Sequence, residues 1–319
     1  MGKIYVVGMG PGKKEYMTFE AVDALEASDL IVGYTVYINL VKQELYPSSL
    51  SGPEGDDTGT VPTGKEFIST GMGRERDRCE ICLEKASEGK TVSLVCSGDA
   101  QIYGMAGLLY EMREEMGLLP ECDIEVVAGV SAAQSCGALL GAPLGNDFCA
   151  ISLSDYLTPW EVIGERLKSG AKGDFVLALY NPASHKRPDH LKRACDILLE
   201  FIEPERPCGL VENAGRGEEK IRLCTLGELR DAEVNMFTTV FVGSSATGII
   251  DGKLVTSRGY KYACPCCGRR TLTEEPGSYE ICPVCGWEDD PLSRRDPAFT
   301  GGANKMSLEE ARRARTHEA

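Results

Sequence analysis

The hydrophobic positions of this chain follow two periods that alternate over about 240 residues. Short apolar runs at residues 3–7, 91–96 and 124–127 have the length and the β-branched content of buried strands. Between such runs, apolar side chains recur at helical spacing, as at Phe19, Val22 and Leu25. Further strands are expected at 29–32, 148–153, 175–179, 209–211 and 238–242, and a further helix at 105–116. The alternation predicts an α/β protein.

A Leu-Leu-Pro sequence at 118–120 interrupts this alternation and indicates a boundary between two lobes, each built around a sheet. We therefore predict an N-terminal α/β lobe at 1–118, a second α/β lobe at 119–258 and a separate small module at 259–319. No internal repeat and no long low-complexity tract is evident in the sequence.

Three short motifs predict local structure in the second lobe. Thr158, followed by Pro159 and Glu161, has the pattern of a capping box at a helix start. Thr225 and Glu228 offer a second capping box. The pair Asp251-Gly252 lies between two apolar runs and predicts the type I′ turn of a β-hairpin.

The charge balance excludes some classes of partner. The chain has 319 residues, with 34 Lys and Arg against 49 Asp and Glu, a formal net charge of −15. Such a surface repels phosphate backbones, so we expect neither nucleic acid nor an anionic membrane as a partner. No stretch reaches the ~18 apolar residues of a membrane span. The chain opens at 3–7 with an expected strand rather than a cleavable leader, which favours a cytoplasmic enzyme.

Three glycine-containing turns follow expected strands. The first is Gly8-Met9-Gly10-Pro11-Gly12, the second covers 97–104 and the third covers 128–133. The first turn is not a dinucleotide fingerprint, because Lys13 stands where the third glycine would be, and it lacks the spacing of a phosphate-binding P-loop. Ligands of open α/β sheets sit beyond the carboxyl ends of strands, so the three turns are expected to converge on one small molecule. Asp99 either holds a ribose hydroxyl or a substrate group, or caps the following helix.

Several distinctive sequence blocks lie along the first 260 residues. They are GMGPG at 8–12, SGDAQIYG at 97–104, AGVSAA at 128–133, LGAPL at 140–144, ISLSD at 151–155, LTPWEV at 157–162, LYNPASHKRP at 179–188, MFTTV at 236–240 and DGKLVTSRGY at 251–260. Together these blocks resemble the tetrapyrrole methylases of cobalamin biosynthesis. Within that superfamily, the likeness is to the enzymes that methylate carbon 17 of precorrin-3B or of its cobalt-containing form. It extends over about residues 1–260.

This resemblance implies two α/β lobes around a cleft, a homodimer, and S-adenosylmethionine bound in the cleft. The implied donor-binding residues are Gly8, Gly10, Pro11 and Gly12 in the first turn, Gly98, Asp99 and Tyr103 around the methionine and ribose, Ser131 and Ala132 in the third turn, and Tyr180, Asn181, Asn213 and Ala214 on the adenine side. The chain departs from the family at Ala100-Gln101, where Pro-Gly is usual, at Ala128, where proline is usual, and at Ser244, where asparagine is usual.

The implied reaction is methylation of (cobalt-)precorrin-3B at carbon 17, coupled to ring contraction with loss of carbon 20 from the ring, to give (cobalt-)precorrin-4. Methyl transfer from a sulfonium needs alignment and exclusion of water rather than a protein nucleophile. The contraction needs proton transfers, and we assign Asp99 as the candidate catalytic group. Two alternatives stay open: a tetrapyrrole methylase acting at a different ring carbon, and a metal-dependent interaction protein with inactive methylase lobes.

The implied substrate is a small-molecule tetrapyrrole with many carboxylates, which an acidic chain must hold with local clusters of positive charge. Candidates for this role are Arg74, Arg76, Arg78, Lys186 and Arg187. The three closely spaced arginines also fit a solvated helix face.

Five of the fourteen cysteines lie between Cys264 and Cys285. Cys264 and Cys267 form one CxxC pair and Cys282 and Cys285 another, each followed by glycine, which is typical of knuckles that bring four thiolates to one tetrahedral metal. Zinc in a closed structural site is the expected occupant, and iron in a rubredoxin-like site is the alternative. A cytoplasmic setting disfavours disulfides. Cys266 has no assigned partner in this scheme.

The same segment resembles the small CPCC cysteine-rich family, through CPCCG at 264–268, YEICPVCGWEDD at 279–290 and GGANKMSLEEA at 301–311. That resemblance implies a shape and no activity, and it indicates no particular protein partner. We expect the module to depend on its metal to fold. The nine other cysteines, including Cys79 and Cys82, are interpreted as small hydrophobic residues of the core or of helices.

Overall fold

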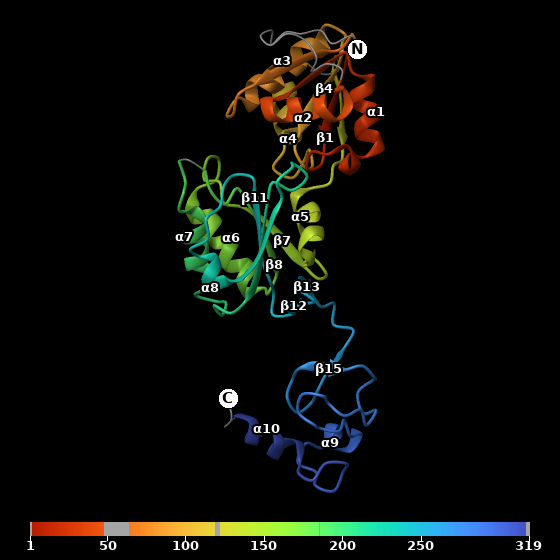
Figure 1. Ribbon diagram of the computed structural model, residues 1–319, viewed down its shortest axis with the longest axis vertical. Coiled ribbons are helices and arrows are strands. Elements are labelled where there is room, and N and C mark those ends of the chain that lie inside the picture. Colours follow the sequence, from red (N-terminus) through yellow and green to blue (C-terminus); the bar gives the residue numbers. More distant parts are fainter. Residues whose placement is uncertain (1, 48–63, 119–121, 185, 317–319) are drawn as a thin grey trace. The chain divides into compact units, whose positions relative to one another are not determined.

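A computed structural model describes residues 2–47, 64–118, 122–184 and 186–316 of the chain (Figure 1). The chain divides into two compact units, of which the first ends at Thr256 and the second begins at Ser257. The first unit contains two lobes, each built around a five-stranded sheet, and the second contains the cysteine cluster. No helix in the described ranges has the length and apolar character needed to cross a membrane.

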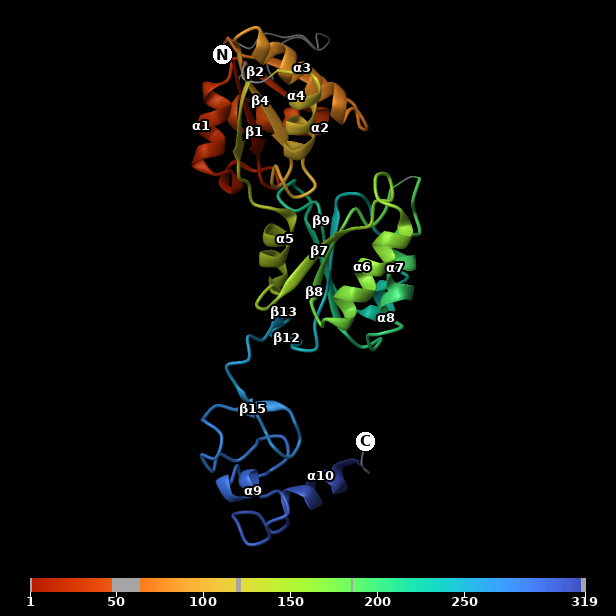
Figure 2. The ribbon, with the colours of Figure 1, turned by 180° about the vertical axis from the view of Figure 1, so that it is seen from behind.

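The first lobe is a parallel sheet with helices on both faces (Figures 1 and 2). Its strands are β1 (Gly2–Gly8), β2 (Leu30–Tyr34), β3 (Glu66–Thr70), β4 (Thr91–Cys96) and β5 (Cys122–Val127), in the order β3-β2-β4-β1-β5. Its helices are α1 (Phe19–Ala27) and α2 (Thr35–Leu45) on one face, and α3 (Glu75–Ser87) and α4 (Ala106–Glu115) on the other. Because both faces are covered, the central strands are continuous apolar runs.

The second lobe is a mixed sheet, also covered on both faces. Its strands are β7 (Phe148–Ser152), β8 (Val176–Tyr180), β9 (Pro207–Glu212), β10 (Lys220–Thr225) and β11 (Thr238–Val242), in the order β10-β9-β11-β8-β7. One face carries α6 (Trp160–Lys172), α7 (His190–Leu198) and α8 (Leu226–Leu229). The other carries α5 (Ala132–Leu140), beside a small sheet of β6 (Gly141–Ala142), β12 (Thr247–Ile250) and β13 (Lys253–Thr256). Only β7 and β8 pair in parallel within the five-stranded sheet.

The strand β5 was predicted to open the second lobe, but it completes the first sheet. Its residues pair in parallel with β1, from Gly2 opposite Cys122 to Val7 opposite Val127. The sequence break at 118 follows the end of α4 and does not separate the lobes. The chain enters the second lobe only after β5, where α5 packs on the second sheet.

Two local predictions were wrong. Phe19 was expected on the buried face of its helix, but it is the first residue of α1 and its side chain is 91% exposed. Thr158 was expected to cap α6, but that helix begins at Trp160 with Pro159 in the cap position and no side-chain cap. Proline supplies the extended backbone of a cap without a hydrogen-bonding side chain.

Two other local predictions were confirmed. Thr225 and Glu228 form the reciprocal capping box of α8. Asp251 and Gly252 have φ angles of 49° and 71°, as a type I′ turn between β12 and β13 requires.

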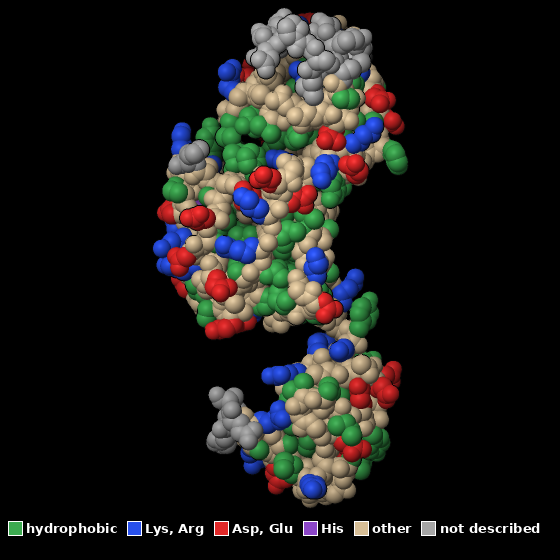
Figure 3. All heavy atoms as spheres, in the orientation of Figure 1, with side chains coloured by type: hydrophobic (Ala, Val, Ile, Leu, Met, Phe, Trp, Pro, Cys, Tyr) green, Lys and Arg blue, Asp and Glu red, His purple; other side chains and the backbone are tan. Residues whose placement is uncertain are grey.

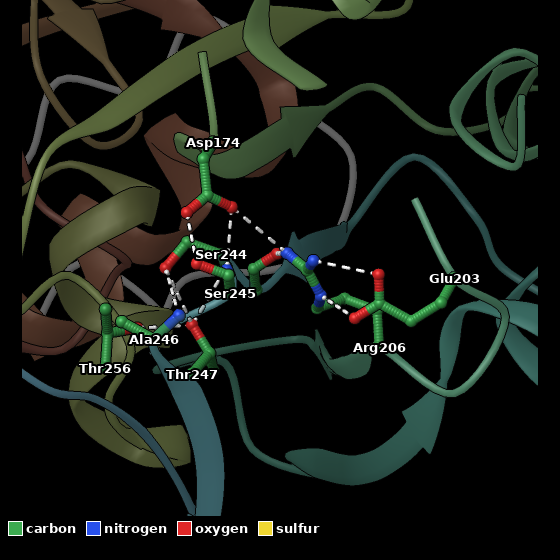
Figure 4. A network of polar contacts seen from close by, with 9 residues as sticks. Asp174, Glu203, Arg206, Ser244, Ser245, Ala246, Thr247 and Thr256 are labelled. Carbon is green, nitrogen blue, oxygen red and sulfur yellow. Dashed lines mark hydrogen bonds and ion pairs between the residues drawn. The ribbon is translucent and has the colours of Figure 1, made fainter. Parts of the chain in front are cut away.

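A buried arginine holds together the end of the second lobe where β9 begins and β11 ends. Arg206 is 7% exposed, and its guanidinium donates to both carboxylate oxygens of Glu203, to Asp174 and to the Gly243 carbonyl (Figure 4). Asp174 also accepts from the amide and the hydroxyl of Ser245. The network ties three connecting segments to one cation, and a charge buried in this way must keep its partners.

Charged side chains of both signs are interspersed over the face of the molecule seen in Figure 3. Surface ion pairs among the described residues include Lys168 with Glu165 at 2.9 Å and Lys90 with Glu66 at 2.9 Å. On this face, neither the positive nor the negative side chains are gathered into one large area.

The second unit has little regular structure. Its elements are β14 (Tyr262–Ala263), β15 (Arg270–Leu272), α9 (Pro291–Arg295) and α10 (Leu308–Thr316). Its small core combines Leu272, Trp287 and Leu308 with cysteine side chains. A core of this size supplies little hydrophobic stabilisation, so a metal cross-link would contribute much of the stability.

Candidate active site and metal centre

The three glycine-containing turns lie side by side at one edge of the first sheet. They follow β4, β1 and β5, which are neighbouring parallel strands whose carboxyl ends meet. The Gly10 amide donates to the Gly98 carbonyl at 3.0 Å, and the Gly98 amide donates to the Gly10 carbonyl at 2.8 Å. The turns thus lie together, and their convergence on one small molecule stays a prediction.

Glycine at positions 8 and 129 allows this close approach. A Cβ atom on Gly8 would lie 2.7 Å from the Gly129 amide nitrogen and 2.8 Å from the Gly98 carbonyl oxygen. A Cβ atom on Gly129 would lie 2.5 Å from the Gly8 carbonyl oxygen and closer still to that of Gly98. Because these neighbours are backbone atoms, a side chain at either position would push the turns apart.

Asp99 joins the second turn to the third. Its side chain is 7% exposed; Oδ1 accepts from the amides of Gln101 at 2.8 Å and Ile102 at 3.2 Å, and Oδ2 accepts from the Gly129 amide at 3.0 Å. The alternative role as a helix cap does not hold, because α4 begins at Ala106 with Met105 as its cap residue. Asp99 therefore acts in this structure as an acceptor that orders two turns.

The second lobe faces these turns with the carboxyl ends of β8 and β9 and the start of β11. Both β8 and β9 run antiparallel to β11, so these three ends lie at the same edge of the sheet. A pocket lies between the two sets of turns. It is lined by Pro11, Tyr37, Ser97, Gly98, Asp99, Ile102, Tyr103, Ser131, Ala132, Ser135, Cys136, Tyr180, Asn181, Asn213, Ala214, Arg216, Met236, Phe237, Thr238 and Thr239.

Three pocket residues have a backbone conformation that non-glycine residues seldom adopt. Tyr103, Asn181 and Asn213 have φ angles of 57°, 53° and 56°. Asparagine tolerates this left-handed region, but a tyrosine there is strained. Strain of this kind persists where the surroundings enforce it, and it is concentrated at functional sites.

Two tyrosines close one side of the pocket. The Tyr103 hydroxyl, from the first lobe, donates to the Ala150 carbonyl of β7 at 3.0 Å, and its ring centroid lies 5.1 Å from that of Tyr180. The Tyr180 hydroxyl accepts from the Ala133 amide at 2.9 Å. Burial raises the pKa of both tyrosines and of the Cys136 thiol, so all three groups stay protonated at neutral pH. None of them is an activated nucleophile.

Most of the implied donor-binding residues line this pocket. Those that do are Pro11, Gly98, Asp99, Tyr103, Ser131, Ala132, Tyr180, Asn181, Asn213 and Ala214. Gly8, Gly10 and Gly12 do not line it but shape the turn behind it; a Cβ atom on Gly12 would lie 3.1 Å from the Gly215 carbonyl oxygen.

Ten residues of the pocket lining were not among the implied donor-binding residues: Tyr37, Ser97, Ile102, Ser135, Cys136, Arg216, Met236, Phe237, Thr238 and Thr239. For Arg216 a signal existed. It stands between Gly215 and Gly217 directly after β9, and both glycines have positive φ angles. A lone cation in a glycine turn at a strand end resembles a ligand-binding position.

The cations proposed to bind substrate carboxylates do not line the pocket. Arg78 is buried in α3, where it donates to Thr70, Gly71 and Glu75. Arg74 pairs with Asp77, and Arg76 pairs with Glu115. All three arginines make their contacts within the first lobe. Arg74 and Arg76 are exposed there, in agreement with the alternative of a solvated helix face.

The second pair of cations also lies outside the pocket lining. Arg187 donates to Ser154 and Ser184 and lies 3.5 Å from Asp155, and Lys186 is exposed. Arg187 therefore holds its own loop against the end of β7.

The cysteine side chains of the second unit form one cluster. The sulfur atoms of Cys264, Cys267, Cys282 and Cys285 all lie within 4.8 Å of one another. Cys264 and Cys285 are 3.5 Å apart and Cys267 and Cys282 are 3.8 Å apart, too far for disulfide bonds of about 2.05 Å. A tetrahedron with Zn–S bonds of about 2.3 Å has edges of about 3.8 Å. The donor set and its spacing therefore fit a tetrahedral metal ion.

Known proteins share both parts of this chain. A model of the Tetrapyrrole (Corrin/Porphyrin) Methylases matches residues 3–230, and a model of the Cysteine-rich CPCC family matches residues 262–317. Over 262 residues the chain is 42% identical to the cobalt-factor III methyltransferase of Priestia megaterium, an alignment that covers 82% of this chain and 45% of that protein. The chain thus spans about half of that relative's length.

Two further relatives match over nearly their whole length. The chain is 42% identical over 255 residues to a Salmonella typhimurium protein named probable cobalt-factor III C(17)-methyltransferase, covering 80% of this chain and 98% of that protein. The crystal structure of the methyltransferase CobJ superposes with a TM-score of 0.68 at 34% identity, covering 81% of this chain and 100% of that one. The chain belongs to the tetrapyrrole methylases, with a CPCC-type cysteine-rich segment following the methylase lobes.

Proposed function

We propose that this protein transfers the methyl group of S-adenosylmethionine to carbon 17 of cobalt-factor III or of precorrin-3B, with contraction of the macrocycle. The names and the 42% identity of the two relatives support the substrate and the ring position. The single observation that carries the proposal is the pocket between the facing strand ends of the two lobes, lined by ten of the implied donor-binding residues. Those relatives favour the cobalt-containing substrate.

In this reaction the bond between sulfur and the methyl carbon breaks, and its electron pair returns to sulfur. An electron pair of the macrocycle forms the new carbon–carbon bond, leaving S-adenosylhomocysteine. The protein's part is to align the two reactants and exclude water. Backbone groups of the Gly98 and Ser131 turns hold the donor, and the Tyr103 and Tyr180 rings narrow the pocket beside it.

We assign Asp99 to positioning rather than to proton transfer. Both of its carboxylate oxygens already accept backbone N–H groups from the second and third turns. A group engaged in this way supports the donor site by fixing the two turns that form it. The acid or base of the ring contraction is then a different group.

The test is incubation of the purified chain with S-adenosylmethionine labelled with carbon-13 in its methyl group, and with cobalt-factor III or precorrin-3B. We expect a product heavier by one methyl group, with the label at carbon 17 by NMR. A label at another carbon would identify a methylase of different regiochemistry. Binding of S-adenosylhomocysteine without conversion of either substrate would support an inactive, interaction-only chain instead.

The second unit is proposed to hold zinc in a structural role. All four ligands come from the chain, so no position is left open for a substrate. Zinc bound here would cross-link the two CxxC knuckles and stabilise the small core around Trp287. Elemental analysis of purified protein should find one zinc per chain; iron in the same site would instead give a coloured protein.

A homodimer is also part of the proposal, because the family resemblance implies one. Light scattering measures it directly. A mass of one chain at micromolar concentration would contradict this part alone.

A further inference from the structure

The side chain of Arg216 begins on the second lobe and ends on the first. Its Nε donates to the Pro11 carbonyl oxygen at 3.0 Å, and its Nη2 donates to the Ser97 hydroxyl oxygen at 2.5 Å. Pro11 and Ser97 belong to two of the three glycine-containing turns. One guanidinium therefore ties the turn after β9 to the turns after β1 and β4.

Two aromatic rings hold the guanidinium in place. Its carbon lies 5.4 Å from the centroid of Tyr37 and 5.2 Å from that of Phe237, distances at which a cation is attracted to a ring face. Tyr37 comes from the first lobe and Phe237 from the second. The orientation of the guanidinium is thus set by contacts to both lobes.

One edge of the guanidinium has no hydrogen-bond partner among the described residues. The hydrogen bonds to Pro11 and Ser97 use Nε and Nη2, which share the side edge of the group. The end edge, formed by Nη1 and the second N–H of Nη2, has the geometry that receives both oxygens of a carboxylate. Arg216 is part of the pocket lining.

The charge of Arg216 has no counter-ion in the described part of the chain. Among the described residues no carboxylate forms an ion pair with it, and the nearby Glu219 is paired with Lys13 at 3.8 Å instead. A partly buried cation without a counter-ion is unusual in a chain of net charge −15. It favours an anionic ligand group in the pocket.

We propose that Arg216 is the carboxylate-binding residue of this pocket and that its contacts to both lobes hold it in position. This inference rests on the proposed function and deepens it. The carboxylate could come from two sources: the amino-acid group of the donor, or the side chains of the macrocycle. Arginine suits the task better than lysine, because its planar fork can bind the first lobe with one edge and a carboxylate with the other.

The test compares Arg216→Gln and Arg216→Lys with a matched control, Arg230→Gln. Arg230 lies on the same lobe, outside the pocket, and makes surface ion pairs with Asp196 and Asp231. Calorimetry measures the binding of S-adenosylhomocysteine and of 5′-methylthioadenosine, which has the same nucleoside but no carboxylate. Steady-state kinetics with cobalt-factor III measure KM and kcat.

If the donor carboxylate is the ligand, Arg216→Gln should bind S-adenosylhomocysteine roughly 10- to 100-fold more weakly and leave 5′-methylthioadenosine binding within about twofold of wild type. If a macrocycle carboxylate is the ligand, both nucleosides should bind normally and KM for cobalt-factor III should rise by a similar factor. Arg216→Lys should lie between wild type and Arg216→Gln in either case, because it keeps the charge and loses the fork.

The proposal is overturned if Arg216→Gln matches Arg230→Gln in all three measurements. It is also overturned if Arg216→Gln weakens the binding of both nucleosides equally while KM is unchanged, because Arg216 would then only hold the two lobes together. Thermal unfolding of each variant shows whether it is folded, and Arg216→Lys carries the test if the glutamine variant is not. If wild-type protein binds neither nucleoside and converts no substrate, the proposed function itself has failed.

Discussion

Substitution of Gly129 by alanine tests the contact between the glycine-containing turns directly. The new Cβ atom would lie 2.5 Å from the Gly8 carbonyl oxygen, 2.6 Å from the Gly8 carbonyl carbon and closer still to the Gly98 carbonyl oxygen. All these neighbours are backbone atoms of two other turns. No side-chain rotation can relieve the overlap, so the turns themselves must move.

The size of the effect follows from these distances. To reach ordinary van der Waals contact, the Gly8 carbonyl oxygen must recede by about 0.9 Å. Forcing extra volume into a packed site costs about 1–3 kcal/mol of folding stability. A misplacement of about 1 Å in a site that aligns reactants costs roughly 100-fold in rate. We therefore expect a modest loss of stability and a much larger loss of turnover.

Denaturant unfolding measures the first quantity, and donor binding with single-turnover methyl transfer measures the second. The matched control is Gly107→Ala in α4, where a Cβ atom would meet nothing within 4 Å. Alanine is the better helix former there by about 0.5–1 kcal/mol, so this variant should be as stable as wild type or slightly more stable. Its activity should be unchanged.

Gly129→Ala protein that bound S-adenosylhomocysteine and turned over at wild-type rates would refute this reasoning. It would mean that the turns can separate without disturbing the site. A variant that lost stability and activity in proportion, with no excess loss of activity, would show a general packing defect instead.

Three other predictions follow from the same contacts. Asp99→Asn replaces one acceptor oxygen by an NH₂ group, which would face a backbone N–H. Binding of the methyl donor, measured by calorimetry, should therefore weaken roughly 10- to 100-fold, the equivalent of about 1–3 kcal/mol. Unchanged binding would show that Asp99 does not order the turns. Hydrogen bonding from Arg206 lowers the pKa of Glu203, and although burial raises the pKa of Asp174, hydrogen bonds from Ser245 and Arg206 lower it more. Both carboxylates therefore stabilise the fold above their ordinary pKa values of 4.5 and 3.8. This stabilisation is lost as the pH falls through their lower pKa values in the folded protein. The denaturation midpoint should therefore fall less steeply with acid in Asp174→Asn than in wild type, and equal slopes would contradict the assignment. Removing metal with a strong zinc chelator should increase hydrogen exchange throughout residues 262–316 while S-adenosylhomocysteine binding persists; unchanged exchange would show that the segment folds without metal.

The sequence predicted those parts of the site that lie next to a strand in the chain. The turns at 8–12, 97–104 and 128–133 each follow an apolar run, and parallel pairing of β4, β1 and β5 then brings them to one edge. The clustering of the four metal-ligand candidates was also predictable, because both CxxC pairs are local motifs.

Features that depend on distant contacts were missed. Arg216 meets Pro11 and Ser97, which precede it by 205 and 119 residues, and no local pattern reports such a pairing. The edge strand β10 was not predicted because Lys220 and Arg222 give it a polar, exposed beginning, as edge strands often have. The lobe boundary was misplaced because the Leu-Leu-Pro break marks a helix end, and only the pairing of β5 with β1 shows where that strand belongs.

The division of the pocket between main-chain and side-chain contacts has an evolutionary consequence. On the first lobe, Gly10 and Gly98 meet through backbone hydrogen bonds alone, so these contacts survive most amino-acid changes around them and fail only where a glycine is lost. On the second lobe, the wall is made by side chains such as Arg216 and Phe237, which a single codon change can replace. Single substitutions on the second lobe can therefore change the pocket wall without disturbing the backbone contacts that hold the glycine-containing turns together.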